Sequence, residues 1–333
     1  MTKPDDAIAR HLKHYLTEYL PRARGRALNT VRSYRDGLCL LLRYFQDKHK
    51  IAPHRVTIAD LSMENVMDFL NELQQSRKNS ASTRNQRRAA IRKFVMYLQE
   101  REPTLAGDLA GLLAIPHKKT SHRMLGYLTC EEMEAILDAP NANTWSGKRD
   151  RALFAAMYNT GVRVTEIANA RVADVTLTSD GTLAFTGKGR KERALPLWKE
   201  TKTILRKWIA GNHLQPEQPL FANARGQTIT RSGVYKRLKA AVQKAGKTCP
   251  SIRKKQVSPH TLRHSNAMYL LDAGVDIAVI ALWLGHESIE TTHRYITADL
   301  GMKEKALKTL QPPNGGAFRF RPGDKLLAFL KSL

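Results

Sequence analysis

Hydrophobic residues in the first third of the chain recur at the spacing of three and four residues that is typical of amphipathic helices. A first helix is predicted from Asp5 or Asp6 to about Tyr19, where Pro21 is expected to end it. Three more are predicted to begin near residues 29–30, 60–62 and 82. Their inward positions are Val31, Leu38, Leu41, Leu42 and Phe45, then Val66, Phe69, Leu70 and Leu73, then Ile91, Phe94, Val95 and Leu98. Residues 1–114 therefore indicate a helical bundle.

The pattern changes at residues 115–126, IPHKKTSHRMLG, which indicate a basic linker between domains. After it, Thr129 and Glu132 have the spacing of a capping box, and a longer helix is predicted over about 147–159. Short β-like segments follow at 172–178, 182–186 and 193–196, separated by Gly-containing turns, which predicts a small antiparallel sheet. Helices are expected to resume near residues 200, 232, 260, 277 and 291. A short apolar helix from about residue 324 would lie in a C-terminal tail, 314–333.

The net charge of the chain limits the kinds of binding partner that are expected. The 333 residues include 55 Lys and Arg against 30 Asp and Glu, a formal net charge of +25. Both parts of the chain share it, with 22 basic against 12 acidic residues in 1–120 and 33 against 18 in the rest. A basic surplus over both domains indicates that a polyanion contacts both, and double-stranded DNA is the expected partner.

Other classes are disfavoured. The three cysteines are far apart, so neither a disulfide framework nor a cysteine zinc site is expected. No apolar run approaches the roughly 20 residues of a membrane span, and no secretory leader is expected at the N-terminus. We therefore expect a cytoplasmic, nucleoid-associated protein with no membrane partner.

Arginines at residues 84, 88 and 92 recur every fourth position of a predicted helix and so share one face, with Arg87 beside them. Almost no acidic residue balances them. A solvated surface is the ordinary explanation of such a run. The overall charge favours DNA-backbone contact by this face and by the linker lysines: Arg84, Arg87, Arg88, Arg92, Lys118 and Lys119.

Familiar cofactor motifs are incomplete. Residues 181–188 have the wrong glycine spacing for a phosphate loop. The segment HESIE, which begins at His286, ends in Glu where a zinc motif has His, and His260 with His264 lacks a third ligand at a recognised spacing. We expect no metal and no other cofactor.

Basic and polar residues of types that can take part in catalysis occur instead in the second half of the chain. They lie in the strings TGVRVTE, TGKGRKER, HTLRH and LGHESIETTHRY. They contribute Arg163, Glu166, Lys188, His260, Arg263, His286 and Tyr295. Each alone has an ordinary structural explanation. Together they suit phosphodiester cleavage without a metal, because guanidiniums can clamp phosphate oxygens and a tyrosine can attack phosphorus.

In TGVRVTE, HTLRH, LGH and the following RY, and in their order and spacing, the chain resembles the tyrosine recombinase (phage integrase) family. The resemblance covers about residues 127–300 by motif and 1–115 by layout. It implies that Tyr295 is the nucleophile, that Arg163 and Arg263 clamp the phosphate, and that Lys188 is the general acid. It also implies roles for His260 as general base or proton carrier, for His286 as a hydrogen-bond donor to the phosphate, and for Glu166 as support for the Arg and His groups. Asn266 departs from the family, which often has a bulky apolar residue there.

The expected fold is mainly α with a small antiparallel sheet in the catalytic domain, arranged as a two-domain C-shaped clamp on DNA. The expected domains are a helical DNA-binding domain 1–114, a linker 115–126 and a catalytic domain 127–333. The resemblance implies a site-specific recombinase or integrase, forming a 3′-phosphotyrosyl intermediate, for a mobile element. A homotetramer on paired sites and DNA-bending accessory proteins are the expected partners, and the tail could pack on its own domain or on a neighbouring protomer. A type IB topoisomerase and a DNA-binding protein that does not cut remain alternatives.

Overall fold

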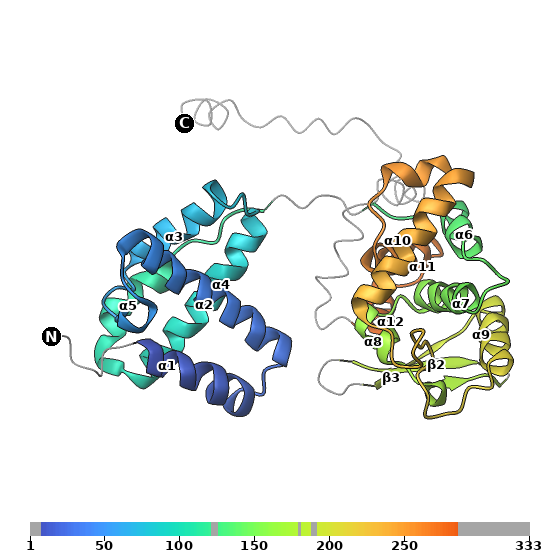
Figure 1. Ribbon diagram of the computed structural model, residues 1–333, viewed down its shortest axis with the longest axis horizontal. Helices are drawn as coiled ribbons and strands as arrows, with labels where there is room; N and C mark the ends of the chain where they lie inside the picture. Colours follow the sequence, from blue (N-terminus) through green and yellow to red (C-terminus); the bar gives the residue numbers. More distant parts are fainter. Residues whose placement is uncertain (1–7, 121–125, 179–180, 188–191, 286–333) are drawn as a thin grey trace, which may run out of the picture. The chain divides into compact units, whose positions relative to one another are not determined.

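The computed structural model describes residues 8–120, 126–178, 181–187 and 192–285. Within the chain two compact units are distinguished, Met1–Arg123 and Met124–Leu333. Both are mainly helical, and the strands of the described residues belong to the second unit (Figure 1).

The first unit is a helical bundle. Its elements are α1 (Ile8–His14), a π-helical segment (Tyr15–Ala23), α2 (Leu28–His49), α3 (Met63–Gln75), α4 (Ala81–Arg101) and α5 (Ala106–Ala114), with short 3₁₀ turns at Pro53–Arg55 and Pro103–Leu105. The predicted inward residues Phe45, Phe69, Phe94 and Leu98 are at most 2% exposed and belong to one core. The helical periodicity of the sequence therefore located this core correctly.

Two helix ends in this unit differ from the predictions. Pro21 does not end the first helical segment but lies inside the π-helical turn, which continues to Ala23. The fourth helix is capped by Ser80, whose hydroxyl accepts from the backbone N–H of Thr83, two residues before the predicted start. At α3, in contrast, Ser62 caps the helix as one of the two predicted alternatives.

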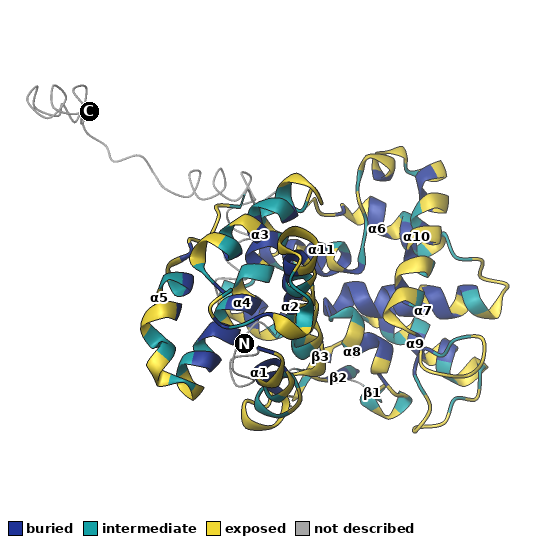
Figure 2. Ribbon diagram, turned by 60° about the vertical axis from the view of Figure 1, so that its left-hand side comes forward, coloured by how far each residue is buried: buried dark blue, intermediate teal, exposed yellow. Residues whose placement is uncertain are grey.

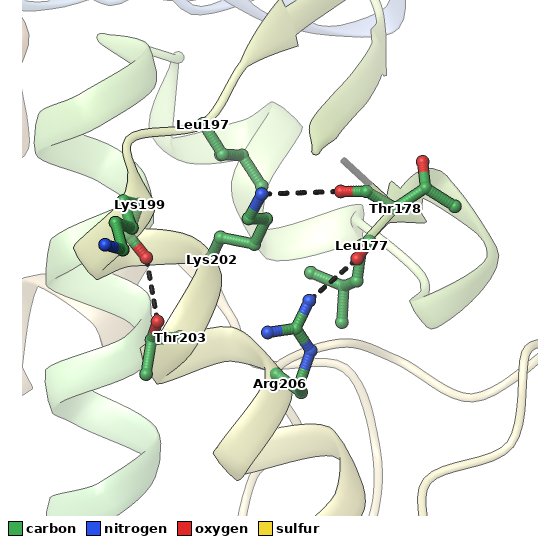
Figure 3. Close-up of a pocket in the computed structure, with 7 residues that line it drawn as sticks. All are labelled: Leu177, Thr178, Leu197, Lys199, Lys202, Thr203 and Arg206. Carbon is green, nitrogen blue, oxygen red and sulfur yellow. Dashed lines mark hydrogen bonds between the residues drawn. The ribbon is translucent and has the colours of Figure 1, made fainter. Parts of the chain in front are cut away.

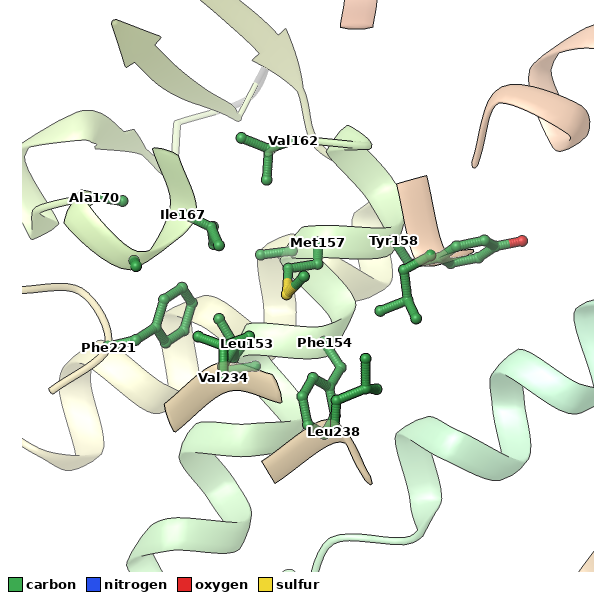
Figure 4. Close-up of a cluster of buried hydrophobic side chains, with 14 of the residues drawn as sticks. Leu153, Phe154, Met157, Tyr158, Val162, Ile167, Ala170, Phe221, Val234 and Leu238 are labelled. Carbon is green, nitrogen blue, oxygen red and sulfur yellow. The ribbon is translucent and has the colours of Figure 1, made fainter. Parts of the chain in front are cut away.

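The second unit packs helices around a central helix. Its helices are α6 (Cys130–Asp138), α7 (Trp145–Thr160), α8 (Val164–Asn169), α9 (Lys199–Gly211), α10 (Arg231–Thr248), α11 (Pro259–Asp272) and α12 (Ile277–Leu284), with 3₁₀ turns at Val172–Asp174 and Pro250–Lys254. Every residue from Ala152 to Thr160 of α7 is buried, so this helix is dark blue over most of its length in Figure 2. Leu153, Phe154 and Met157 meet Phe221 and residues of α10 in the core (Figure 4).

The sheet has three antiparallel strands in the order β1 (Val175–Thr176), β2 (Thr182–Thr186) and β3 (Glu192–Pro196). The predicted strand over 172–178 is therefore wrong in length, because its first residues form a 3₁₀ turn whose Asp174 carboxylate accepts from the Arg171 N–H. In the register of the other pair, Leu183 faces Leu195 and Phe185 faces Arg193. The two leucines are buried, which fixes the inward face of the sheet.

The predicted capping box is confirmed at the start of α6. The Thr129 hydroxyl accepts from the Glu132 N–H, and the Glu132 carboxylate accepts from the Thr129 N–H. Burial alone would raise the pKa of Glu132, but hydrogen bonds from Lys255, Ser251 and Thr129 hold it below its usual value. The same carboxylate thus fastens α6 to the segment that leads into α11.

None of the helices in the described part of the chain is long and apolar enough to cross a membrane. The helix predicted near residue 291 and the tail 314–333 lie outside the described residues.

Candidate active site

The site lies where the C-termini of two helices meet, and each of these helices is capped by a glycine. Helix α7 ends at Gly161, with φ +58°, and α12 ends at Gly285, with φ +64°, so both chains leave their helices in the left-handed conformation that favours glycine. A Cβ at Gly161 would lie 2.5 Å from Oδ1 of Asn266 and 2.6 Å from a methyl carbon of Leu284. The two helix C-termini can therefore pack closely only because glycine is present.

Arg163 and Arg263 bind the carbonyl groups at these helix ends. The Arg263 guanidinium donates to the carbonyls of Gly161 and Leu284, both at 2.7 Å. The Arg163 guanidinium donates to the carbonyl of Gly285 at 2.7 Å. The C-terminus of a helix carries partial negative charge, which stabilises a cation there. Packing thus brings together two arginines that are 100 residues apart in the sequence.

Their exposure differs. Arg263 is 6% exposed, so protein surrounds its guanidinium. The Arg163 side chain is 35% exposed, so part of it faces solvent. Arg163 can therefore reach a ligand directly, whereas Arg263 is held in a fixed position at the base of the site.

Glu166 orients Arg163. Its carboxylate accepts from the Arg163 backbone N–H at 3.0 Å and from the Arg163 guanidinium at 3.1 Å. Burial alone would raise the pKa of Glu166, whose side chain is 8% exposed, but hydrogen bonds and positive charge from Arg193 and Arg163 lower it below its usual value. Glu166 is therefore an ionised carboxylate shared by two guanidiniums.

Arg193 is a member of this cluster that the sequence reasoning missed. It lies on β3 and donates to both carboxylate oxygens of Glu166, at 2.8 and 3.3 Å. A signal was available in the alternation of the strand, because Arg193 lies two residues before the buried Leu195 and so on the inward face. An inward arginine requires an acidic or carbonyl partner.

His260 lies at the start of α11, three residues before Arg263, and keeps an exposed edge. Partial burial of its ring, followed by the charges of Arg263, Arg231 and Arg163, lowers the pKa of His260 below the usual 6.5. The sequence reasoning did not single out Arg231, which begins α10. The imidazole is thus neutral at pH 7 and faces a strongly positive neighbourhood.

Three of the predicted site residues, Lys188, His286 and Tyr295, lie outside the described residues. The strands on either side of Lys188 are described, and β2 ends at Thr186 while β3 begins at Glu192. Gly285, whose carbonyl binds Arg163, directly precedes His286 in the sequence.

The arginine face of α4 needs one correction. Arg84 is 3% exposed, and its Nε and Nη1 atoms have no hydrogen-bond partner among the residues that the structure describes. Its remaining nitrogen lies 3.9 Å from the sulfur of Met67, because the side chain turns against α3. Arg84 is therefore not on an exposed face with the others.

The other predicted DNA-contact residues keep some exposure. Arg88 donates to the carbonyl of Ile115 at 2.6 Å, Arg87 lies 3.3 Å from the carbonyl of Ser33, and Arg92 lies 3.3 Å from the sulfur of Met96. Lys118 and Lys119 are exposed. We refer to these five residues, which lie on α4 and in the segment after α5, as the basic surface of the first unit.

Asn266, at the position where the resemblance leads to the expectation of a bulky apolar residue, is fully buried on α11. Its amide donates to the backbone carbonyl of Asn159 at 3.0 Å. The side chain of Asn159 in turn donates to the Pro196 carbonyl and accepts from the Trp198 N–H. Asn266 and Asn159 therefore form a polar link between α11, α7 and the end of β3.

Outside this cluster, an open pocket of about 650 Å³ lies between the end of β1 and α9. Figure 3 shows Lys202 and Arg206 donating to the carbonyls of Thr178 and Leu177 there. The pocket shares no residue with the arginine cluster. The described residues contain no group of three or more His, Cys, Asp or Glu that could hold a metal ion.

Comparison with known proteins identifies the family of the chain. The Phage integrase family matches residues 126–301, and the Phage integrase N-terminal SAM-like domain matches residues 12–102. The y4rC protein of Sinorhizobium fredii, which carries the name integrase/recombinase, is 38% identical over 98% of both chains. Tyrosine recombinase XerD of Oceanobacillus iheyensis is 34% identical over 83% of this chain and 90% of its own.

Solved structures share the fold. The XerH site-specific recombinase, in a post-cleavage complex with its difH substrate, superposes with a TM-score of 0.67 at 24% identity, covering 88% of this chain and 83% of that one. The Tn1549 transposon integrase superposes with a TM-score of 0.65 at 16% identity, covering 90% and 99%. This chain belongs to the phage integrase family of tyrosine recombinases.

Proposed function

We propose that this tyrosine recombinase cleaves and rejoins DNA at specific sites through a 3′-phosphotyrosyl intermediate on Tyr295. The observation that carries the proposal is the convergence of Arg163 and Arg263 on the carbonyl groups at the ends of α7 and α12. Two fixed guanidiniums bound to the helix end that directly precedes His286 in the sequence are suited to bind one phosphate.

The proposed reaction has two balanced steps. The Tyr295 oxygen bonds to phosphorus while the bond from phosphorus to the 5′ oxygen breaks. His260 takes the tyrosine proton, and Lys188 gives a proton to the departing 5′ oxygen. The reverse attack by a 5′ hydroxyl restores the phosphodiester without a nucleotide, because the intermediate keeps the energy of the bond.

The arginines stabilise the charge that develops during this reaction. The pentacoordinate transition state carries more negative charge than the phosphodiester, and Arg163, Arg263 and a His286 donor would surround it. Glu166 does not contact the phosphate in this proposal. It holds Arg163 in place through the two hydrogen bonds described above.

The proposed partner is double-stranded DNA that contacts both the helical domain, residues 1–114, and the catalytic domain, residues 127–333, which the linker 115–126 joins. Solved relatives of the fold include a lambda integrase tetramer bound to a Holliday junction, which supports a homotetramer on paired sites. The fold of the Tn1549 transposon integrase supports a mobile element as the source of those sites. The same proposal includes DNA-bending accessory proteins as partners and a location at the nucleoid in the cytoplasm.

A nicked suicide substrate tests the function. Cleavage near the nick releases a short strand that cannot return to attack the intermediate, so a covalent protein–DNA adduct accumulates. We expect the wild-type protein to form this adduct on its own recombination site and not on unrelated DNA. Specific binding without an adduct would support a DNA-binding protein that does not cut.

The lowered pKa of His260 predicts the pH dependence of cleavage. The neutral imidazole is the form that accepts a proton, so the rate should fall on acidification only below pH 6.5, where His260 becomes protonated. Replacing Arg231 by Gln removes one of the charges that lower this pKa, so the acidic limb should move toward pH 6.5. Single-turnover cleavage measured against pH checks both expectations.

The control for this prediction is Arg206→Gln, an exposed arginine on α9 that does not affect the His260 pKa. Its acidic limb should coincide with that of the wild-type protein. The role of His260 as general base would be contradicted if the wild-type rate already falls at or above pH 6.5. It would also be contradicted if the rate of Arg231→Gln falls at the same pH as that of the wild type.

The basic surface of the first unit predicts the salt dependence of DNA binding. Replacing Arg88 and Arg92 by Ala should weaken binding to all sequences and reduce the slope of log affinity against log salt by roughly 1 for each lost phosphate contact. Arg84→Met is the matched control, because its guanidinium is buried and should leave the slope unchanged. Binding titrations at several salt concentrations measure the slopes, and equal slopes for wild type and the double variant would remove α4 from the interface.

A further inference from the structure

Arg193 occupies a junction between three separate segments of the second unit. The guanidinium faces both oxygens of the Glu166 carboxylate, and its Nε donates to the carbonyl of Trp283, in the last turn of α12, at 3.2 Å. Its side chain is only 14% exposed, and it also lies 5.7 Å from the centre of the Phe185 ring on β2. The guanidinium is therefore held from two sides, by the Glu166 carboxylate and by the end of α12.

The contacts of Arg193 lead to the predicted phosphate clamp. Glu166 binds the backbone and the guanidinium of Arg163 through the same two oxygens that accept from Arg193. On the α12 side, Trp283 is two residues before Gly285, whose carbonyl accepts from Arg163. Arg193 thus touches both of the groups, Glu166 and the end of α12, that hold Arg163.

Gly285 shows how closely Arg193 packs against the end of α12. A Cβ at this position would lie 2.9 Å from Nη1 of Arg193 and 3.1 Å from the central carbon of its guanidinium. The positive φ of Gly285 excludes most other residues independently. The end of α12 and the guanidinium therefore fit together without space for a side chain between them.

The backbone of Arg193 belongs to β3, the strand that follows Lys188, the predicted general acid. Strand β3 begins at Glu192, four residues after Lys188, and pairs with β2 along its length. A guanidinium presents a rigid planar set of donors, so it can bridge a carboxylate and a carbonyl at once. Lysine carries the same charge but cannot hold both acceptors in this geometry.

We propose that Arg193 is a positioning residue for strand cleavage, which acts through Glu166 on Arg163 and ties β3, the strand that follows Lys188 in the sequence, to the end of α12. It contacts no phosphate. It fixes where the clamp lies relative to the strand that follows the general acid. This proposal rests on the proposed function, since it assumes that Arg163 and Lys188 act on the scissile phosphate.

The test compares Arg193→Gln and Arg193→Lys with the wild-type protein in single-turnover cleavage of the suicide substrate. A misplacement of about 1 Å in a reacting group costs on the order of 100-fold in rate, so Arg193→Gln should slow cleavage by about that factor. Arg193→Lys keeps the charge beside Glu166 and should lose less. Affinity for DNA, measured at the same salt concentration, should stay at the wild-type value because the side chain is turned inward.

A double-mutant cycle distinguishes positioning from a general loss of structure. If Arg193 acts through Glu166, Arg193→Gln should have little further effect on cleavage in a Glu166→Gln protein. Independent structural damage would make the two effects multiply. Arg206→Gln, which loses a hydrogen bond to a backbone carbonyl outside the cluster, is the matched control and should cleave at the wild-type rate.

The outcomes separate this proposal from the proposed function. If Arg193→Gln cleaves at the wild-type rate, the positioning role is overturned. It is also overturned if the effects of Arg193→Gln and Glu166→Gln on the cleavage rate multiply in the double variant. If Arg193→Gln does not fold, Arg193→Lys decides, and a wild-type rate in that variant would also overturn it. Absence of an adduct with both the wild-type protein and Arg206→Gln would instead refute the proposed function.

Discussion

Tyr295→Phe should abolish the covalent protein–DNA adduct and leave DNA binding intact. The change removes one oxygen, the proposed nucleophile, and keeps the aromatic ring. A denaturing gel of the suicide-substrate reaction measures the adduct, and mass mapping of the DNA-linked peptide identifies the residue that carries it. We expect no adduct from this variant, because a lost nucleophile cannot be replaced by the remaining electrostatic stabilisation.

The structure supplies matched controls for this experiment. Tyr235 on α10 and Tyr269 on α11 are 47% and 43% exposed, so both are accessible hydroxyls in the same unit. Tyr158 is 9% exposed, and burial raises its pKa, which makes it a poor nucleophile. Phe substitutions at 235 and 269 should therefore keep the adduct, and an adduct mapped to either tyrosine would overturn the assignment of Tyr295.

Arg263→Ala is expected to have the second largest effect. Loss of one group that stabilises the transition state should slow cleavage by on the order of 100-fold or more. The structure adds a second effect, because the buried guanidinium satisfies the carbonyls of Gly161 and Leu284. Leaving such groups without a partner costs about 1–3 kcal/mol each, so the melting temperature should fall as well. Single-turnover cleavage at saturating protein and thermal unfolding measure the two effects separately.

Two further variants separate catalysis from stability at this position. Arg263→Lys keeps the positive charge and should therefore cleave faster than Arg263→Ala. Because lysine cannot bridge two carbonyls, the rate should stay below that of the wild type. Arg253→Ala removes a guanidinium that donates to the carbonyl of Gly246 at 2.6 Å, outside the arginine cluster. That control should lower stability without lowering the rate of the folded, DNA-bound protein. A wild-type rate for bound Arg263→Ala would contradict a role for Arg263 in the clamp.

The features that depend on neighbouring residues could be predicted from the sequence. The spacing of apolar residues located the helices of the first unit and their core. The pair Thr129 and Glu132 predicted the capping box, and the helices near residues 200, 232, 260 and 277 begin within one residue of those positions. Hydrophobic periodicity and capping act over three or four residues, so the local sequence contains the whole interaction.

Elements whose local signals conflict were predicted less well. Pro21 was expected to end a helix, but a π-helical turn accommodates it. The segment 172–178 has β-branched residues, yet only Val175 and Thr176 pair with β2, because Asp174 stabilises a 3₁₀ turn before them. In both cases a backbone arrangement outside the common helix and strand patterns decided the result.

The sequence by itself determined the helical architecture, the basic character of both units, and the residue types and order that resemble a recombinase site. Only the tertiary structure decided which of those residues meet. Packing of α7 against α11 and α12 brings Arg163 to Gly285 and Arg263 to Gly161, contacts between residues more than 100 positions apart. In the first unit, packing of α4 against α3 buries Arg84, and in the second unit the position of β3 makes Arg193 a partner of Glu166. Local propensity cannot determine such contacts, because their free energy comes from groups that the folded chain places side by side and the sequence keeps far apart.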